Sequence, residues 1–313
     1  FYEFRPEQLS VAMAVEEAIE ADKPLLAEAG PGVGKSMAYL VPFMNWALEA
    51  DRKVVVSTYT KALQNQLFVK DLPLLRDILG REVRYALCMG SENYVCLRRA
   101  DLLSKEDLFQ GTGHSGSLDR IIQWIKTTPT GLVTDMDFVP ESRYWEKFRR
   151  EADLCSGKRC RYYGSCFFMN AKKEQSSAHI LITNHALLFS ALRKGANVLP
   201  DFDGLVIDEA HTLEDVATGH FGAEFSSYAA AHLLARTEEL LKLASAEFSK
   251  TGKDKEALDR LSESITRLRA VSERFFSEAA VSCGVKEVPA EFDPGEIDCR
   301  DIKGALAELR TRL

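Results

Sequence analysis

A glycine-rich loop and an acidic box, far apart in the chain, constrain its fold more than any other feature. Residues 29–36 have the sequence AGPGVGKS, and residues 208–211 have the sequence DEAH. Each segment follows a short apolar run and precedes a helical stretch. Apolar strands that alternate with helices favour a parallel sheet with helices on both faces. In such sheets, ligands bind at the carboxyl ends of the strands, where both motifs are expected.

Further strands and helices are expected on either side of a long insertion. Runs rich in aliphatic and β-branched residues predict strands at residues 24–28, 53–58, 83–88, 179–183 and 204–208. Helices are predicted at Ser36–Glu49 and Lys61–Lys70. Residues 92–169 interrupt the sheet. They include a flexible loop at residues 111–117.

After about residue 214, strand-like runs end and helices are expected. The residues Leu258, Leu261, Ile265 and Leu268 recur at helical spacing, as on one face of a helix. Two prolines within residues 288–295 predict a break between helices. This part therefore differs in class from the preceding α/β region.

The two motifs have the residue types that phosphate chemistry requires. Glycines at positions 30, 32 and 34 allow backbone N–H groups to surround phosphate oxygens. Lys35 would contact the outer phosphates, and the Ser36 hydroxyl would bind Mg²⁺. Asp208 would also hold Mg²⁺, and Glu209 would orient the attacking water. Ala29 stands where the strict loop pattern has its first glycine.

Four cysteines between the two motifs predict a metal centre. Cys96, Cys155, Cys160 and Cys166 are separated by 58, 4 and 5 residues. Zinc sites usually contain a closer pair, whereas an iron–sulfur cluster tolerates wider loops. The spacing favours a cluster modestly and leaves zinc open. Cys88, Cys283 and Cys299 have no ligand spacing and are interpreted as structural.

Basic and aromatic residues surround these cysteines. The chain has a formal net charge of −7, yet residues 143–174 contain nine Lys/Arg against four Asp/Glu. Basic side chains interleaved with stackable rings are typical of a surface that binds single-stranded nucleic acid. The candidate residues for this contact are Arg149, Arg150, Lys158 and Arg159.

The composition narrows the class of protein further. An odd count of seven cysteines argues against a disulfide framework and favours a reducing cytoplasm. No uninterrupted apolar run is long enough to predict a membrane span. The chain begins with Phe1 rather than methionine, and we expect it to be a fragment of a longer protein.

Taken together, these motifs resemble the iron–sulfur DNA helicases of superfamily 2, the DinG and XPD group, and most closely the bacterial DinG branch. Beyond the loop and the acidic box, the resemblance rests on four segments: Arg5–Gln8, Ser57–Leu67, Asn93–Cys96 and Thr183–Leu188. It covers roughly residues 1–215.

The resemblance implies an α/β fold in which a RecA-like P-loop domain carries two additions. The first part of this motor domain would span residues 1–91, an Fe–S cluster domain 92–169, and the second part with the DEAH box 170–219. A helical arch domain would span residues 220–313, incomplete, and a second RecA-like domain would be absent.

The resemblance also implies functional residues and cofactors. The cofactors would be ATP, Mg²⁺ and a 4Fe–4S cluster on the four cysteines. Arg5 and Gln8 would lie beside the adenine, and His211 would complete the nucleotide site. Thr58, Lys61 and Gln64 would contact DNA.

The implied function is an ATP-dependent DNA helicase that moves 5′→3′ on single-stranded DNA. Forked or R-loop DNA would be its substrate, and it would act as a monomer in the bacterial cytoplasm. We expect the fragment alone to bind nucleotide without efficient hydrolysis or unwinding. Two alternatives stay open: a single-stranded nucleic-acid binding module without turnover, and a zinc-stabilised P-loop ATPase that acts on proteins.

Overall fold

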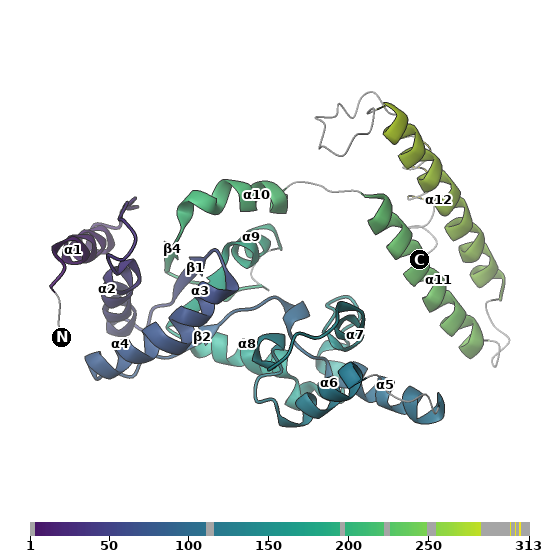
Figure 1. Cartoon of the computed structure of the whole chain (residues 1–313), viewed down its shortest axis with the longest axis horizontal. Coiled ribbons are helices and arrows are strands. Elements are labelled where there is room, and N and C mark those ends of the chain that lie inside the picture. The colour runs from purple at the N-terminus through teal and green to yellow at the C-terminus, as the bar shows by residue number, and fades with distance from the viewer. Residues whose placement is uncertain are drawn as a thin grey trace. The chain divides into compact units, whose positions relative to one another are not determined.

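The computed structural model of the chain contains two compact units, Phe1–Gly222 (unit 1) and Ala223–Leu313 (unit 2). It describes residues 4–110, 116–194, 198–221, 226–248 and 255–282, together with Asp301, Gly304 and Ala307. Unit 1 holds a four-stranded sheet surrounded by helices, and the described part of unit 2 is helical (Figure 1). None of the described helices combines the length and the apolar character needed to cross a bilayer.

The sheet of unit 1 is parallel, as the sequence predicts. Its strands are β1 (Val54–Thr58), β2 (Tyr85–Leu87), β3 (Ile180–Asn184) and β4 (Gly204–Ile207). They lie in the order β2-β3-β1-β4. Val55 of β1 is opposite Leu181 of β3 on one side and Leu205 of β4 on the other. The strands that precede and follow the insertion are therefore direct neighbours.

Alternate side chains of the strands bury against different helices, as a period of two requires. Val54 and Val56 pack in a core with α1 (Pro6–Glu20), α2 (Lys35–Glu49) and α4 (Leu72–Leu79). Val55 packs on the opposite face against α9 (His185–Lys194). Helix α10 (Leu213–Phe221) lies beside α9, with the Phe189 and Phe221 rings 5.4 Å apart. Both faces of the sheet are thus covered.

The strand predicted at residues 24–28 does not form. This segment is irregular, and the side chain of Leu26 is 93% exposed. A strand needs a neighbour for its backbone hydrogen bonds, and within the described residues no strand pairs with the outer edge of β4. Residues 22–29 and β4 instead both line one cavity of about 1010 Å³. The prediction of a fifth strand is wrong for this structure.

The helix predicted at Lys61–Lys70 is interrupted. Helix α3 (Lys61–Gln66) continues into a π-helical turn at Leu67–Asp71 and then into α4. Pro73, at the start of α4, has no N–H and would clash with the carbonyl group four residues before it. A π turn widens the helix at this point and accommodates the proline.

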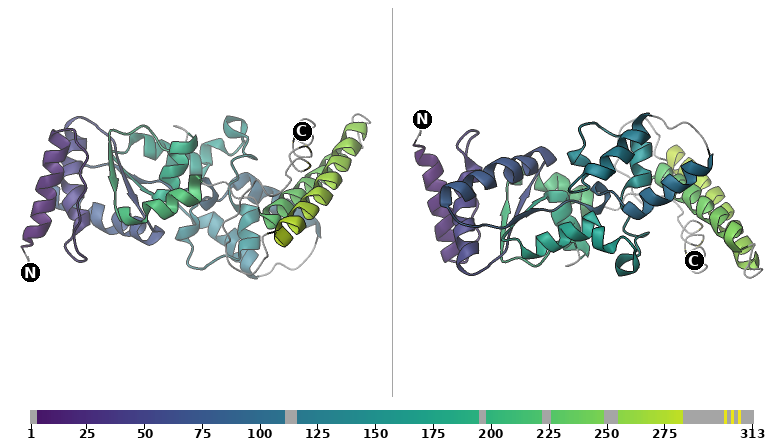
Figure 2. Two further views of the ribbon diagram at one scale, coloured as in Figure 1. Left: turned by 90° about the horizontal axis from the view of Figure 1, so that it is seen from above. Right: turned by 90° about the horizontal axis from the view of Figure 1, so that it is seen from below.

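The insertion between β2 and β3 forms a small helical layer. Its helices are α5 (Leu97–Gln110), α6 (Gly116–Thr127), α7 (Ser142–Phe148) and α8 (Phe167–Ser177). Its own core contains Val95, Ala100, Ile121 and Phe148. In both views of Figure 2, helices α5–α7 lie at the opposite end of unit 1 from α1. The loop predicted at residues 111–117 is largely outside the described residues, and α6 begins at Gly116.

Unit 2 contains a pair of long helices, α11 (Ser227–Phe248) and α12 (Lys255–Ser282). Leu234 of α11 packs against Ile265 and Leu268 of α12, with Leu261 beside them, which confirms three of the four residues of the predicted apolar face. Arg269 and Glu238 form an ion pair between the helices with a distance of 2.6 Å. The predicted break at residues 288–295, and the structural role expected of Cys283 and Cys299, lie outside the described residues.

Candidate functional site

The glycine-rich loop ends in the N-terminus of α2. Gly32 and Gly34 have φ angles of +82° and +87°, a region that side-chain-bearing residues rarely adopt. The turn that they form leads into Lys35 and Ser36, the first residues of α2. The unpaired N–H groups of a helix N-terminus attract anions, and a preceding turn directs further N–H groups to the same point. The local backbone therefore has the features of a phosphate-binding site.

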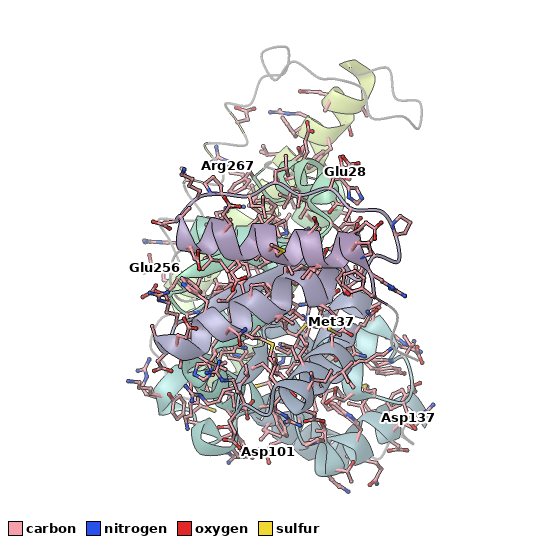
Figure 3. The ribbon with its side chains drawn as sticks, turned by 90° about the vertical axis from the view of Figure 1, so that its left-hand side faces the viewer. Glu28, Met37, Asp101, Asp137, Glu256 and Arg267 are labelled. Carbon is pink, nitrogen blue, oxygen red and sulfur yellow. The ribbon has the colours of Figure 1, made fainter. Side chains whose placement is uncertain are left out.

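Two side chains at the start of α1 bond to this loop. Arg5 Nη1 donates a hydrogen bond of 2.6 Å to the carbonyl oxygen of Gly32. Gln8 Nε2 donates one of 2.9 Å to the carbonyl oxygen of Gly34. Figure 3 views this layer with α1 in front and Met37 of α2 labelled. The structure thus brings both predicted residues to the phosphate loop, and their expected contact with adenine stays a prediction.

The acidic box lies at the carboxyl end of β4, beside α2. The N–H group of Asp208 donates to the Ser57 carbonyl oxygen of β1 over 2.8 Å. The Tyr39 hydroxyl donates to Asp208 Oδ2 over 3.2 Å. Glu209 has a left-handed backbone with φ of +57°. Strand β1 and helix α2 therefore position the first carboxylate from two directions.

Lys35 faces the second carboxylate. Its ammonium group lies 3.9 Å from Glu209 Oε1 and donates to the Ala29 carbonyl oxygen over 3.3 Å. On the other side of Glu209, Oε2 is 3.5 Å from His211 Nδ1. The predicted lysine, glutamate and histidine thus converge, although they come from distant parts of the sequence.

Burial and charge perturb the ionisation of this group of residues. Burial raises the pKa of the Asp208 carboxyl, and the negative charge of Glu209 raises it further. Burial also raises the pKa of Tyr39 well above its ordinary value, with Asp208 adding to the effect. A half-buried pair of carboxylates beside a lysine is the environment in which a divalent cation would be stabilised.

Sequence reasoning missed two residues of this region. Tyr39 lies four residues after Lys35, hence on the same face of α2, and that spacing was a usable signal. His185 is wholly buried, and its Nδ1 lies 2.7 Å from the Ser57 hydroxyl. No spacing in the sequence points to that contact, because the two residues are 128 positions apart.

A cavity of about 1010 Å³ joins the acidic box to the inner face of α1 and α2. One part of its wall is polar and contains Lys35, Tyr39, Asp208, Glu209 and His211. The other part is apolar and includes Val15, Phe43, Trp46 and Leu205. The polar wall has the charged groups that a polyphosphate and its metal require, and the cavity has room for a nucleotide.

The four candidate cysteine ligands all lie in the insertion or at its border and have free thiols. Cys155 is exposed, and the other three are partly exposed. The Cys155 sulfur accepts a hydrogen bond of 3.4 Å from the Gly157 N–H group. The Cys96 N–H group donates to the Phe148 carbonyl oxygen over 2.8 Å. In the part of the chain that the structure describes, no three Cys, His, Asp or Glu side chains converge as metal ligands.

Side-chain contacts draw the first cysteine towards the loop of the other three. Arg98, two residues after Cys96, donates a hydrogen bond to the Ser156 hydroxyl, next to Cys155. Arg161, next to Cys160, forms an ion pair with Asp101 of α5. Short 3-10 turns at Gly157–Arg159 and Tyr163–Ser165 shape the loop between the cysteines. These contacts thus bring the cysteine-bearing segments together.

The basic residues of the insertion differ in accessibility. Lys158 and Arg159 are exposed on a 3-10 turn. The Arg150 guanidinium instead packs over the Phe168 ring at 4.1 Å, and the Nε atoms of Arg149 and Arg150 are buried. An exposed cation can reach a phosphate backbone, whereas a packed guanidinium supports the local core.

The candidate DNA-contacting residues at the end of β1 also differ in accessibility. Lys61 is exposed, and its ammonium group donates to Asn93 Oδ1 over 2.9 Å. Thr58 and Gln64 are buried at no more than 1% exposure, so their side chains do not face solvent in this structure. Their expected contact with DNA therefore stays a prediction, and it would require these side chains to become accessible. Lys61 retains a suitable position.

Similar proteins include bacterial helicases. The chain is 34% identical over 231 residues to the ATP-dependent DNA helicase YoaA of Haemophilus influenzae, covering 72% of the chain and 36% of that protein. It is 37% identical over 238 residues to the ATP-dependent helicase DinG of Mycobacterium tuberculosis, covering 70% of the chain and 36% of that protein. It is 28% identical over 286 residues to the 3′-5′ exonuclease DinG of Bacillus subtilis, covering 88% of the chain and 30% of that protein.

The chain spans about a third of the length of these relatives. No protein-family model matches it. The aligned region covers most of the chain in all three comparisons.

Proposed function

The chain belongs to the family of helicases named DinG and YoaA, and we propose that it is the ATP-binding part of an ATP-dependent DNA helicase. The observation that carries the proposal is the convergence of Lys35, Asp208 and Glu209 beside a glycine-rich loop at the N-terminus of α2. This arrangement supplies a phosphate cradle, a cation and two carboxylates at one edge of a parallel sheet. The nucleotide would occupy the polar wall of the cavity.

Each residue of the site would have a separate role in ATP hydrolysis. Backbone N–H groups of the loop and the Lys35 ammonium would bind the phosphates. Ser36 and Asp208 would hold Mg²⁺, which neutralises phosphate charge when it is bound. Glu209 would orient the attacking water and accept its proton. Tyr39 keeps the Asp208 carboxylate in place through its hydrogen bond.

Single-stranded DNA is the proposed polymer substrate, with 5′→3′ movement and forked or R-loop structures as its physiological context. Exposed Lys61, Lys158 and Arg159 support the contact with a phosphate backbone. We also propose that the 313-residue chain binds nucleotide and DNA by itself without efficient hydrolysis or unwinding. We propose that the protein acts as a monomer in the bacterial cytoplasm.

We propose that a 4Fe–4S cluster is bound by Cys96, Cys155, Cys160 and Cys166. Free thiols, the contacts that gather their segments, and the N–H donor to the Cys155 sulfur support this assignment. Among the described residues no three candidate ligands converge on a single metal ion, whereas a cubane takes one thiolate on each of its irons. No step of ATP hydrolysis depends on this cluster. Its proposed role is to hold the insertion together.

Nucleotide and DNA binding by the purified chain test the first proposal. We expect Lys35→Ala to lower affinity for a Mg²⁺–ATP analogue at least about tenfold, because a charge-assisted contact with the phosphates is lost. Its affinity for single-stranded oligothymidylate should be unchanged. Lys53→Ala, at the opposite end of β1, is the matched control and should bind nucleotide like the wild type. Equal nucleotide affinity in the wild type and Lys35→Ala would contradict the assignment.

Metal analysis of anaerobically purified protein tests the cluster. Broad visible absorption with about four irons per chain is expected, as a cubane requires. Cys160→Ser should remove the absorption, whereas Cys88→Ser, a buried thiol outside the loop, should retain it. One tightly bound zinc without iron would overturn the cluster and favour the zinc-stabilised alternative.

A further inference from the structure

A buried group of polar side chains lies at the carboxyl end of β1 and β3, directly behind the acidic box. We call Ser57, Thr58, Gln64, Thr183 and His185 the buried polar cluster. All five are at most 1% exposed. Ser57 and Thr183 are paired residues of β1 and β3, His185 begins α9, and Gln64 belongs to α3. The cluster therefore joins four elements that meet at one edge of the sheet.

His185 connects this cluster to the acidic box. Its Nδ1 and the Ser57 hydroxyl share a hydrogen bond of 2.7 Å. The carbonyl oxygen of the same Ser57 accepts the N–H group of Asp208 at 2.8 Å. Backbone groups of Asp208 and Glu209 also act on the imidazole, although burial is the larger effect and lowers its pKa. Ser57 of β1 thus bonds both to the buried ring and to the backbone of Asp208.

Several polar atoms of the cluster have no hydrogen-bond partner. These atoms are His185 Nε2, Thr58 Oγ1, Thr183 Oγ1 and both polar atoms of the Gln64 amide. Unpaired buried polar atoms are rare in folded proteins, and each costs free energy comparable to a lost hydrogen bond. A second arrangement that pairs some of them would offset that cost. These atoms could therefore form new hydrogen bonds if the packing around them changed.

The outer side of the cluster faces the segment that resembles a DNA-contacting motif. The half-exposed ring of Tyr59 lies 6.4 Å from the His185 ring, centroid to centroid, at an interplanar angle of 32°. Tyr59 is also adjacent to Thr58 and two residues before the exposed Lys61. A DNA strand that contacted this surface would press on the Tyr59 ring, which lies next to the His185 ring.

We propose that His185 is a positioning residue that couples DNA contact at Tyr59 and Lys61 to the placement of Asp208 in the nucleotide site. The inference rests on the proposed function, because it requires both ligands. DNA that moves Tyr59 would displace the imidazole, and the Ser57 contact would transmit the displacement to the backbone of the acidic box. The two ligands would then alter each other's affinity reciprocally.

The test measures nucleotide affinity with and without saturating DNA. The probes are a non-hydrolysable fluorescent ATP analogue with Mg²⁺ and an oligothymidylate. In the wild type, DNA should change nucleotide affinity by about fivefold or more, the usual lower range for coupled sites. His185→Gln and Ser57→Ala should reduce this ratio to about one. Ser57→Ala removes only a hydroxyl group, so it tests the hydrogen bond to His185 with little effect on β1.

His179→Gln is the matched control. His179 is also a buried histidine, but it immediately precedes β3, at the opposite end of the strand from His185. Its ring bonds to Asp51 Oδ1 at 2.9 Å and accepts from the Arg84 N–H group at 3.2 Å. This variant should keep the wild-type ratio even if it unfolds at a lower temperature.

The outcomes separate the inference from the proposed function. A wild-type ratio retained in both His185→Gln and Ser57→Ala would overturn the coupling role. A wild-type protein that binds both ligands independently would overturn the coupling as well, while the proposed function would stand. A wild-type protein that binds no nucleotide would overturn both.

Discussion

The side-chain amide of Gln8 donates a hydrogen bond of 2.9 Å to the carbonyl oxygen of Gly34. Gly34 has a φ of +87°, and a Cβ atom added to it would lie 2.2 Å from the same amide nitrogen. The backbone conformation therefore requires glycine, and a larger residue would also displace the flexible Gln8 side chain from the loop. This contact joins the first helix to the loop that would bind phosphate.

Gly34→Ala should destabilise the protein by about 1–3 kcal/mol, the cost of a side chain in a strained backbone conformation. It should also weaken nucleotide binding, because Gln8 must move away from the loop. Chemical unfolding and analogue binding measure the two effects. Gly30→Ala is the control for folding, since an added Cβ at Gly30 has no neighbour within 4 Å. Equal stability of the two variants would contradict the backbone strain at position 34.

Tyr39→Phe should weaken nucleotide binding only when Mg²⁺ is present. The substitution removes the hydroxyl that donates to Asp208 Oδ2 and keeps the ring that packs in the core. Hydrogen bonds to charged groups contribute about 1.5–3 kcal/mol, so a loss of roughly tenfold or more in affinity is expected. Titrations with and without EDTA separate the two conditions. Tyr85→Phe, which alters a tyrosine of the same core, should bind like the wild type.

Replacing Lys158 and Arg159 together with alanine should weaken binding to single-stranded DNA and reduce its dependence on salt. Each phosphate contact contributes about 0.7 to the slope of log affinity against log salt concentration. The double variant should therefore lose about 1.4 from the wild-type slope. Arg76→Ala is the control, because Arg76 is paired with Asp77 on α4, away from the insertion. An unchanged slope would show that Lys158 and Arg159 do not contact the DNA phosphates.

The stability of the protein should depend on pH through His185. Burial lowers the pKa of His185 from its ordinary value of 6.5, so the unfolded state binds more protons than the folded state below that pH. The stability that depends on neutral His185 is fully present above the pKa of the unfolded state. It is lost as the pH falls through the lowered pKa of the folded state. Urea midpoints at about pH 7.5 and about pH 5.5 measure this loss. His185→Gln should show a smaller difference between the two pH values than the wild type.

Much of the fold follows from local patterns in the sequence. The valine run at residues 54–56 forms β1, and the apolar runs at residues 180–183 and 204–207 form its two neighbours. The alternation of buried residues and the glycines before Lys35 also have local causes. The segment at residues 24–28 has the same apolar character but forms no strand. Whether such a run becomes a strand depends on a partner edge, which composition does not encode.

The candidate site was predictable in its residue types and only partly in its contacts. Lys35, Asp208 and Glu209 were expected together because their motifs end at one sheet edge. The burial of Thr58 and Gln64 was not expected, because resemblance to a DNA-contacting motif does not indicate which of its side chains face the protein interior. The contact between Ser57 and His185 was also missed, since their spacing of 128 residues carries no periodic signal.

The sequence by itself determined the class of fold, the phosphate loop, the acidic box and the helical character after residue 214. These features depend on neighbouring residues, through backbone preference and apolar periodicity. Only the tertiary structure decided that Gln8 supports Gly34, that Tyr39 holds Asp208 and that His185 lies behind the acidic box. The physical reason is that burial and hydrogen bonding between distant segments depend on how strands and helices pack, and a pairing of strands brings together residues that no local pattern relates.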